Sequence, residues 1–298
     1  MRDGPLRRNA RPKRMLYFRP MPAPLLDKLP ARPAPQEPCK VCGTASPLFG
    51  VCDFMKNCEQ RRDPALGRPL AGVPIYYHRC PACGFLFTAA FDGLDDAEVG
   101  ALIYNDDYVR FDPDFVEARP SEMARGVRGL VGDALLRQLG ILDYGGGSGR
   151  LRDLLRASGG SRVDSYDPYF QDSEPQARFD LILCFEVLEH ACRPRRLVAD
   201  LRRWLNPSGM VIFSTLLQPP DIAQQGIDWW YVAPRNGHVS VFTGKSLRDL
   251  FAAEGLDVLH GDNGLHIALT RPAPEFVALG RTPDGKASLA FRTPTPAR

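Results

Sequence analysis

The sequence contains no run of about 18 apolar residues, which is the length that a membrane-spanning helix requires. Its first residues, MRDGPLRRNARPKR, also lack the apolar stretch that follows the charged start of a secretory signal. We therefore expect a cytoplasmic protein without a membrane partner. The 298 residues suit one large and one small domain, and 44% hydrophobic with 24% charged residues is ordinary for a globular chain.

Acidic residues are scarce near the N-terminus. Residues 1–35 hold nine Lys and Arg but two Asp, so this segment carries +7 while the whole chain carries +3. Eight prolines are interleaved with these charges, and such a segment neither propagates a helix nor buries much surface. We predict a disordered, basic, proline-rich tail over residues 1–36. It could contact nucleic acid, or it could be a plain solvated extension.

The dinucleotide fingerprint G-x-G-x-x-G is also missing. The cluster DYGGGSG at residues 143–149 lies between a predicted strand and a predicted helix, where glycines allow a tight turn and close approach of a ligand. A fingerprint that starts at Gly145 needs glycine at position 150, which is arginine, so NAD is disfavoured. The carboxylate of Asp143 opposes a phosphate but suits a cationic amino group, which S-adenosylmethionine carries.

Apolar and amphipathic runs alternate through the second half of the chain. ILDY, VDSYD, FDLILCF and GMVIFSTL are typical of buried strands, whereas LRDLLRASGG, residues 194–205 and SLRDLFAAEG have helical spacing. The last two strands, LDVLHGD and LHIALTR, are separated by Asp-Asn-Gly at 262–264, which is a hairpin signal. We predict an α/β, Rossmann-like, mostly parallel doubly wound sheet with a terminal antiparallel hairpin.

Changes in composition along the sequence divide the chain into segments. We expect a zinc-binding module at residues 37–92, a helical connector that covers the cofactor at 93–135, and the main α/β domain at 136–272. Residues 273–298, rich in Pro and Thr, predict a loosely held C-terminal tail.

Asp167 ends the strand that follows the glycine cluster. A carboxylate at this place can bind both ribose hydroxyls of a nucleoside, and a turn residue before Pro168 is the alternative. In their order and spacing, ILDYGGGSG, Asp167 and FDLILCFEVLEH resemble the class I S-adenosylmethionine-dependent methyltransferase superfamily over about residues 136–272. The cofactor-binding residues that this resemblance implies are Asp143, Gly145, Gly147, Gly149, Asp167, Phe185, Glu186 and Tyr108.

One departure from the family concerns the adenine. Twelve residues separate Asp167 from Asp180, where the family commonly places a helix and a third strand, so we expect a shortened sheet edge. The residue that contacts adenine is therefore not carried over; Asp172 and Gln176 lie nearby in the sequence. Tyr104, together with Tyr108, is an expected cap over the cofactor.

Four cysteines form two Cys-x-x-Cys knuckles, each followed by glycine. Without an export signal this pattern favours a metal site over disulfides, and four thiolates satisfy tetrahedral zinc. The predicted ligands of a structural zinc ion are Cys39, Cys42, Cys80 and Cys83, with Cys52, Cys58 and His78 as substitutes because the loop between the knuckles is long. The arrangement resembles the N-terminal zinc module of certain sugar C-methyltransferases.

A catalytic base is expected after the strand FDLILCF, because ligands of such sheets bind at the carboxyl ends of strands. His190 is the first candidate because its ordinary pKa lies near neutrality, and Glu186 is the second. We expect Glu186, Glu189 and His190 to share one helical face. In a second stretch, Trp229 to His238, His238 is an alternative base, the aromatic residues could wall the acceptor pocket, and Arg235 could hold an anionic substituent.

The sequence thus predicts an S-adenosylmethionine-dependent methyltransferase for a small-molecule acceptor, by C- or O-methylation of a sugar or a secondary metabolite. The absence of an Asp-Pro-Pro-Tyr sequence after LILC disfavours amide or adenine N-methylation. The non-enzymatic alternative is a zinc-containing nucleic-acid-binding or regulatory protein with a methyltransferase-like fold. An NAD-dependent oxidoreductase is a weaker enzymatic alternative, and nothing in the sequence indicates an oligomeric state.

Overall fold

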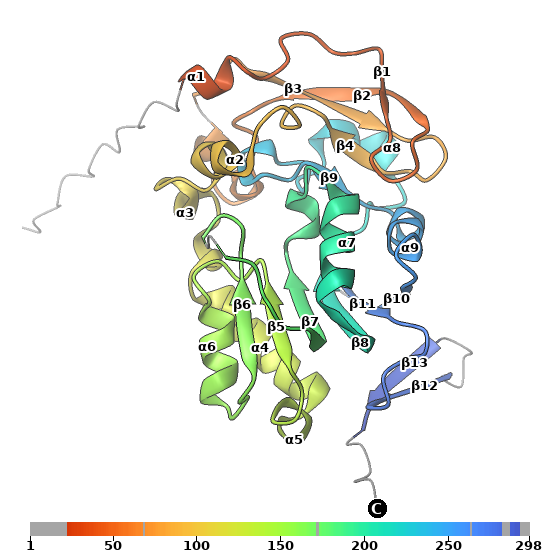
Figure 1. The fold of residues 1–298 in the computed structure, drawn as a ribbon. Helices are drawn as coiled ribbons and strands as arrows, with labels where there is room; N and C mark the ends of the chain where they lie inside the picture. The colour runs from red at the N-terminus through yellow and green to blue at the C-terminus, as the bar shows by residue number, and fades with distance from the viewer. Residues whose placement is uncertain (1–22, 68, 171–172, 263, 282–286, 293–298) are drawn as a thin grey trace, which may run out of the picture.

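A six-stranded mixed sheet forms the centre of the protein in the computed structural model, which describes residues 23–67, 69–170, 173–262, 264–281 and 287–292 (Figure 1). The strands are β5 (Ile141–Tyr144), β6 (Val163–Tyr166), β7 (Phe179–Phe185), β8 (Leu205–Ser214), β10 (Asp257–His260) and β11 (Leu265–Leu269). Their order is β10-β11-β8-β7-β5-β6, with β6, β5, β7 and β8 parallel and β11 antiparallel to both neighbours. The predicted parallel sheet with a reversed terminal hairpin is confirmed.

The shortened edge of the sheet agrees with the sequence spacing. β6 is the edge strand, and the described residues between β6 and β7 contain no further strand.

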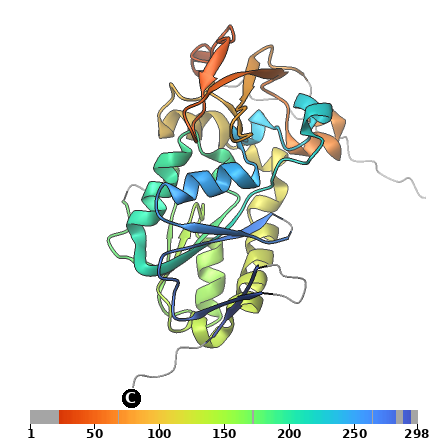
Figure 2. The same cartoon turned by 90° about the vertical axis from the view of Figure 1, so that its right-hand side faces the viewer.

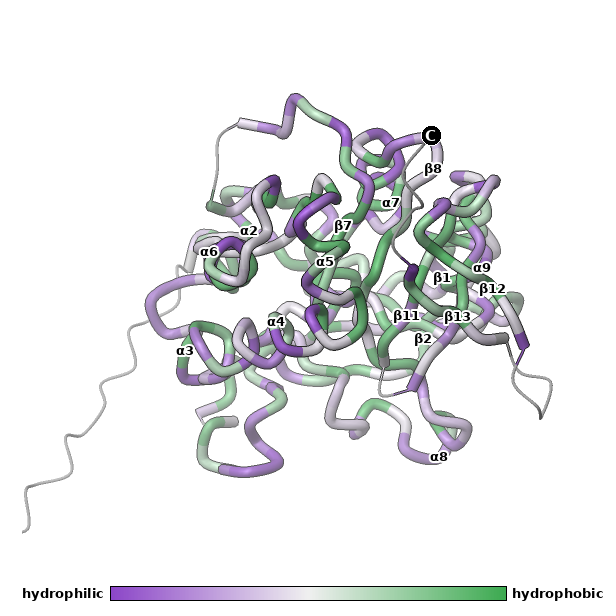
Figure 3. The backbone as a smooth tube through the Cα atoms, turned by 90° about the horizontal axis from the view of Figure 1, so that it is seen from below, coloured by the Kyte–Doolittle hydropathy of each residue, from purple (hydrophilic) through white to green (hydrophobic). Residues whose placement is uncertain are grey.

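Helices cover both faces of the sheet because successive strand residues point to opposite sides. On one face Ile141, Leu181 and Leu183 pack against α4, α5 and α6; on the other, Leu142 and Ile182 pack against α7 and α9. These helices are α4 (Ala118–Val131), α5 (Asp133–Leu136), α6 (Arg150–Ala157), α7 (Pro194–Trp204) and α9 (Gly244–Ala252). The green, hydrophobic stretches of the strands lie between them in Figure 3, which places the core in the sheet.

A second, five-stranded antiparallel sheet carries the cysteine knuckles. It contains β1 (Gln36–Pro38), β2 (Ala45–Asp53), β3 (Pro74–Arg79), β4 (Leu86–Thr88) and β9 (Ser240–Val241), in that order. β9 comes from the segment after β8, so the main domain supplies the last strand of the N-terminal module. The module lies over the carboxyl ends of β5, β6 and β7, at the top of Figures 1 and 2.

Short helices connect the two sheets. They are α2 (Asp96–Ile103), α3 (Tyr108–Phe111) and the 3-10 turn η3 (Pro113–Phe115), followed by α4. The remaining elements are α1 (Ala23–Leu26), η1 (Cys58–Arg61), η2 (Pro64–Gly67), η4 (Leu188–His190), α8 (Ile222–Gln225), η5 (Gly226–Asp228) and η6 (Pro234–Asn236). None of the helices in the described part of the chain is long and apolar enough to cross a bilayer.

Two predicted tails need correction. Residues 1–22 of the basic tail lie outside the described residues, but residues 23–36 pack on the module: Leu29 is buried, and the Tyr76 hydroxyl donates to the carbonyl oxygen of Ala31. The C-terminal segment predicted as loose forms an antiparallel hairpin of β12 (Val277–Arg281) and β13 (Ala287–Phe291). Phe276 and Val277 anchor it because they bury apolar surface in the core beside α5.

Candidate active site

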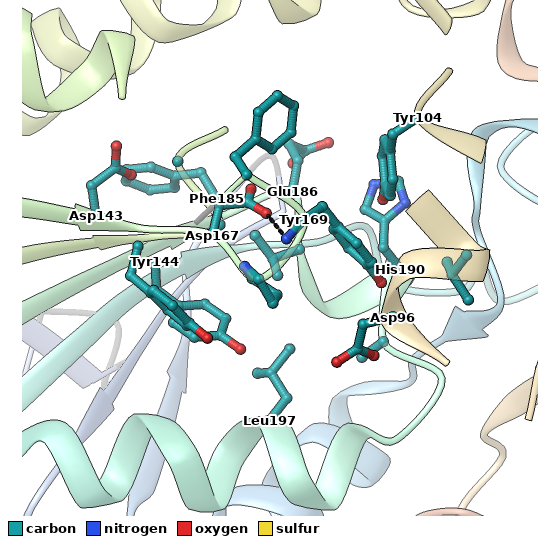
Figure 4. Close-up of a pocket in the computed structure, with 18 of the residues that line it drawn as sticks. Asp96, Tyr104, Asp143, Tyr144, Asp167, Tyr169, Phe185, Glu186, His190 and Leu197 are labelled. Atoms are coloured by element: carbon teal, nitrogen blue, oxygen red, sulfur yellow. Dashed lines mark hydrogen bonds between the residues drawn. The ribbon is translucent and has the colours of Figure 1, made fainter. Parts of the chain in front are cut away.

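A cavity opens above the carboxyl ends of β5, β6 and β7, between the strands and the connector. Its walls include residues from the glycine turn, from the ends of all three strands, from α7 and from α2 to α4. Figure 4 shows Asp143, Asp167, Phe185 and Glu186 reaching this space from the strand ends, with Leu197 of α7 opposite. The strand order thus brings together side chains that are far apart in the sequence.

The glycine turn shapes one end of the cavity. Gly145, Gly147 and Gly149 all have positive φ, which L side chains rarely adopt, and Gly149 caps α6 in the left-handed conformation. Gly146 is required for a different reason, which the sequence did not reveal: a Cβ there would lie 2.3 Å from Oδ2 of Asp143 and 2.5 Å from Oγ of Ser165. The backbone of the turn therefore packs directly against the carboxylate.

Asp143 lies at the base of this turn and is almost fully buried. Its Oδ2 atom has no hydrogen-bond partner among the described residues, and neither has the hydroxyl of Ser165. Burial raises the pKa of Asp143 to about 7. A buried carboxylate with one oxygen free of partners among the described residues is suited to receive a cationic group of a ligand.

Asp167 ends β6 and faces the same cavity. Its two carboxylate oxygens each accept one backbone N–H bond, from Gly147 and Tyr169, both at 2.9 Å. These bonds fix the carboxylate across the glycine turn, and each oxygen keeps a lone pair for a further donor. Burial raises the pKa of Asp167. Both sequence-predicted acidic residues are therefore at the cavity, at the ends of adjacent strands.

The connector forms an aromatic and basic wall. The rings of Tyr104 and Tyr108 have centroids 5.0 Å apart, and Tyr104 also packs on Tyr169 at 4.9 Å. Arg119 of α4, which sequence reasoning missed, lines the cavity and donates to both carboxylate oxygens of Asp112 at 2.7 and 2.8 Å. Both tyrosines line the cavity, and their role as a cap over the cofactor stays a prediction.

Glu186 has an unusual backbone. Its φ is +53°, the only positive value at a non-glycine residue in the described part of the chain, and its Oε1 accepts a hydrogen bond of 2.6 Å from the Ser214 hydroxyl. The following residues form the three-residue 3-10 turn η4 and not a longer helix. The predicted common face is therefore wrong: Glu186 and His190 line the cavity, while Glu189 is fully buried away from it.

His238 and its neighbours lie behind the cavity wall. The His238 ring is packed against His190 with centroids 5.0 Å apart, and it does not line the cavity. Arg235 is buried, donates to the carbonyl oxygen of Ile103 and to Oδ1 of Asn105, and stacks on Phe111. Arg235 thus fastens the connector and does not line the cavity. Trp229 and Tyr231 pack in the core of the module, so they do not wall this cavity.

The cavity wall beyond Asp167 contains residues that the sequence did not indicate. Gln176 is exposed and bonds to the carbonyl oxygen of Glu174, away from the cavity, and Asp172 lies outside the described residues. Instead, Tyr144, Tyr166 and Leu197 present apolar surface to the space beyond Asp167. Tyr144 and Tyr166 lie at strand ends and Leu197 lies on α7, where apolar residues carry no spacing signal for a ligand, which is why these three were missed.

The four predicted zinc ligands converge. The sulfur atoms of Cys39, Cys42, Cys80 and Cys83 lie together, with Sγ–Sγ distances of 3.6 Å (39 to 83), 3.4 Å (42 to 80) and 3.7 Å (42 to 83). Tetrahedral zinc with bonds of about 2.3 Å needs sulfur atoms about 3.8 Å apart, so the set fits this ion. The substitutes Cys52, Cys58 and His78 are not in the cluster.

The α/β part of the chain is similar to a known protein family. Residues 115–261, just under half of the chain, match the family described as "Methyltransferase domain". No curated protein sequence matches the chain significantly.

Solved structures similar to the methyltransferase domain are distant in sequence. A 1,6-didemethyltoxoflavin-N1-methyltransferase from Burkholderia thailandensis is 17% identical, with 66% of this chain and 95% of that chain covered and a TM-score of 0.40. A magnesium protoporphyrin IX methyltransferase from Synechocystis is 13% identical, with 51% and 82% covered and a TM-score of 0.35. The chain spans between 59% and 64% of the length of three further matched structures.

Proposed function

We propose that the protein transfers a methyl group from S-adenosylmethionine to a small-molecule acceptor, by O- or C-methylation. The observation that carries this proposal is the pair of buried carboxylates, Asp143 and Asp167, on either side of the glycine turn. One has an oxygen without a partner among the described residues, and the other is held by two backbone N–H groups. This charge pattern fits a ligand with an ammonium group and a ribose, and it opposes a pyrophosphate.

The cofactor, when bound, supplies a methyl group on a cationic sulfur. Asp143 would hold the ammonium group, Asp167 the ribose hydroxyls, and Tyr144 and Tyr166 would contact the adenine. Tyr104 and Tyr108 would cap the cofactor and exclude water from the reacting atoms. Positioning is the main task of the protein, because the transfer is an in-line displacement that needs an aligned nucleophile.

The acceptor's proton would pass to a side chain of the cavity wall. Of the three predicted bases, Glu186 and His190 line the cavity, and His238 is screened by His190. Desolvation holds the pKa of His190 well below its ordinary value, so its ring is neutral at physiological pH. A small acceptor, such as a sugar or a secondary metabolite, would enter between these residues and the connector.

The four-cysteine cluster would hold a structural zinc ion. All four positions of a tetrahedral ion are taken by thiolates, so the ion would stabilise the module and leave no site for a substrate. The knuckles are bound to the methyltransferase domain: Thr243 donates to the Cys83 carbonyl oxygen at 2.7 Å, and Gln218 to that of Gly84 at 2.7 Å. Removing the ion with a chelator should lower the melting temperature of the wild-type protein in scanning calorimetry. The melting temperature of Cys80→Ser protein should not change when the chelator is added.

Calorimetric titration with adenosylhomocysteine tests the proposed activity, with NAD as the control ligand. We expect adenosylhomocysteine to bind with micromolar affinity and NAD not to bind. Asp167→Asn should weaken adenosylhomocysteine by about tenfold, the worth of a hydrogen bond to a charged group. Asp164→Asn, on the same strand but exposed, is the matched control and should bind as the wild type does. Tight NAD binding, or equal affinity of all three proteins, would contradict the proposal.

A further inference from the structure

Three titratable side chains meet behind the wall of the active-site cavity. Glu189, His190 and His238 each bring a potential metal-ligating atom to within 4.8 Å of the others. Glu189 and His190 come from the turn η4, and His238 comes from the segment that leads into β9. The backbone N–H of Val239 donates to the carbonyl oxygen of Glu189 at 2.8 Å, so the two segments are fixed to each other.

Glu189 is the unusual member of this cluster. Its side chain is fully buried, and neither carboxylate oxygen has a hydrogen-bond partner within the described residues. The hydroxyls of Tyr231 and Thr215 lie near the carboxyl group but do not bond to it with regular geometry. A buried carboxyl group without partners costs free energy, unless a group that is not part of the chain satisfies it.

The histidines are prepared to accept a ligand. Nδ1 of His238 lies 2.8 Å from the carbonyl oxygen of Tyr231, and because a carbonyl oxygen only accepts, this nitrogen carries the hydrogen. Nε2 of His238 therefore keeps its lone pair. A hydrogen bond from the other ring nitrogen to a backbone carbonyl is the usual way in which proteins orient a metal-binding histidine. Nδ1 of His190 is buried and, among the described residues, also without a partner.

We propose that Glu189, His190 and His238 bind a divalent transition-metal ion beside the active-site cavity. Two imidazoles and one carboxylate are a common ligand set for zinc and for iron(II), and three protein ligands leave positions for water or substrate. Ligand atoms about 2.1 Å from the ion lie about 3.4 Å apart, so side-chain shifts of about 1 Å would complete the site. His190, the member that lines the cavity, places the ion within reach of an acceptor.

The role of the ion rests on the proposed methyl transfer. A metal ion lowers the pKa of an oxygen that it binds, which would favour an acceptor with a hydroxyl or enol group. His190 then serves as a ligand, and Glu186 takes the acceptor's proton. The acceptor oxygen bonds to the methyl carbon as the carbon–sulfur bond breaks, which leaves adenosylhomocysteine and a proton on Glu186.

The metal content of the full chain tests the proposal. The protein is saturated with zinc, dialysed against metal-free buffer, and its zinc is counted per chain by mass spectrometry. Glu189→Gln and His238→Gln should each hold about one zinc ion fewer than the wild type. His266→Gln is the matched control, because His266 is also buried and bonds to a backbone carbonyl oxygen, that of Thr215 at 3.1 Å, but is not a member of the cluster. It should keep the wild-type zinc content.

The comparison is restricted to protein that melts cooperatively, so that unfolded variants do not enter the count. Because the readout is the difference between variants, it does not depend on zinc in the four-cysteine cluster. Equal zinc content in the wild type, Glu189→Gln and His238→Gln would overturn the proposal. The count needs no cofactor or acceptor, so failure of this site and failure of adenosylhomocysteine binding are separate results.

Discussion

The protonation of Asp143 should control cofactor affinity between pH 6 and pH 8. Burial raises its pKa to about 7, so the carboxyl group is about nine-tenths neutral at pH 6 and about nine-tenths ionised at pH 8. If the ammonium group of the ligand binds the ionised form, the dissociation constant of adenosylhomocysteine should rise roughly tenfold from pH 8 to pH 6. Calorimetric titration at constant ionic strength measures this ratio.

Asp143→Asn is the variant that isolates the effect. Its amide has nearly the same shape but does not titrate, so its affinity should be weaker at pH 8 and should change little down to pH 6. Any titration of the ligand's own ammonium group, or of Asp167, appears in both proteins and cancels in the comparison. A pH dependence of equal size in the wild type and in Asp143→Asn would refute the assignment of Asp143 to the ammonium group.

The same residue should influence the stability of the ligand-free protein. A carboxyl group whose folded pKa is raised contributes stability that is complete below its unfolded pKa and is lost as the pH rises through about 7. A shift from 3.8 to about 7 corresponds to roughly 4 kcal/mol at pH 8, and Asp143→Asn should recover part of it. Urea unfolding at pH 8 without ligand should therefore show a more stable variant that binds the cofactor less well.

Two further substitutions test the geometry of the site. Gly146→Ala should cost about 1–3 kcal/mol of unfolding free energy and abolish tight adenosylhomocysteine binding, because its Cβ would meet Asp143 and Ser165. Gly129→Ala is the control, because Gly129 faces open space on α4. This variant should gain up to about 1 kcal/mol of unfolding free energy in the same urea titration. Arg235→Ala should lose about 2–4 kcal/mol, because it leaves the carbonyl oxygen of Ile103 unpaired and a cavity beside the connector. Unchanged urea midpoints in Gly146→Ala or Arg235→Ala would contradict the packing described above.

The parts of the fold that depend on local sequence could be predicted. ILDYGGGSG specifies a strand, a tight turn and a helix start, and the turn signal at 262–264 specifies the reversed terminal strand. Asp143 and Asp167 were found because each directly follows a periodic apolar run. The four cysteines could be predicted as metal ligands because zinc sites use Cys-x-x-Cys pairs, a spacing that no other cysteines of the chain have.

The parts that depend on long-range packing could not be predicted. β9 is two residues long, and Ser240 and Val241 carry no strand pattern. They form a strand because they pair with β4. The left-handed backbone at Glu186 is held by Ser214 of a neighbouring strand, so no local signal announces it. Arg235 is a charged residue in a predicted pocket segment, and the structure instead buries it against Phe111.

The contacts of β9 also connect the cysteine module to the wall of the active-site cavity. The segment that forms β9 binds the turn after β7, with the Ser240 hydroxyl donating to the Ala191 carbonyl oxygen at 2.7 Å. The first knuckle binds the same turn, because the Lys40 ammonium group donates to the Cys192 carbonyl oxygen at 3.0 Å. His190 directly precedes these two attached residues in the sequence. A knuckle without its metal ion would loosen Lys40, and the cavity wall would lose the support that fixes His190, although no thiolate touches the cavity.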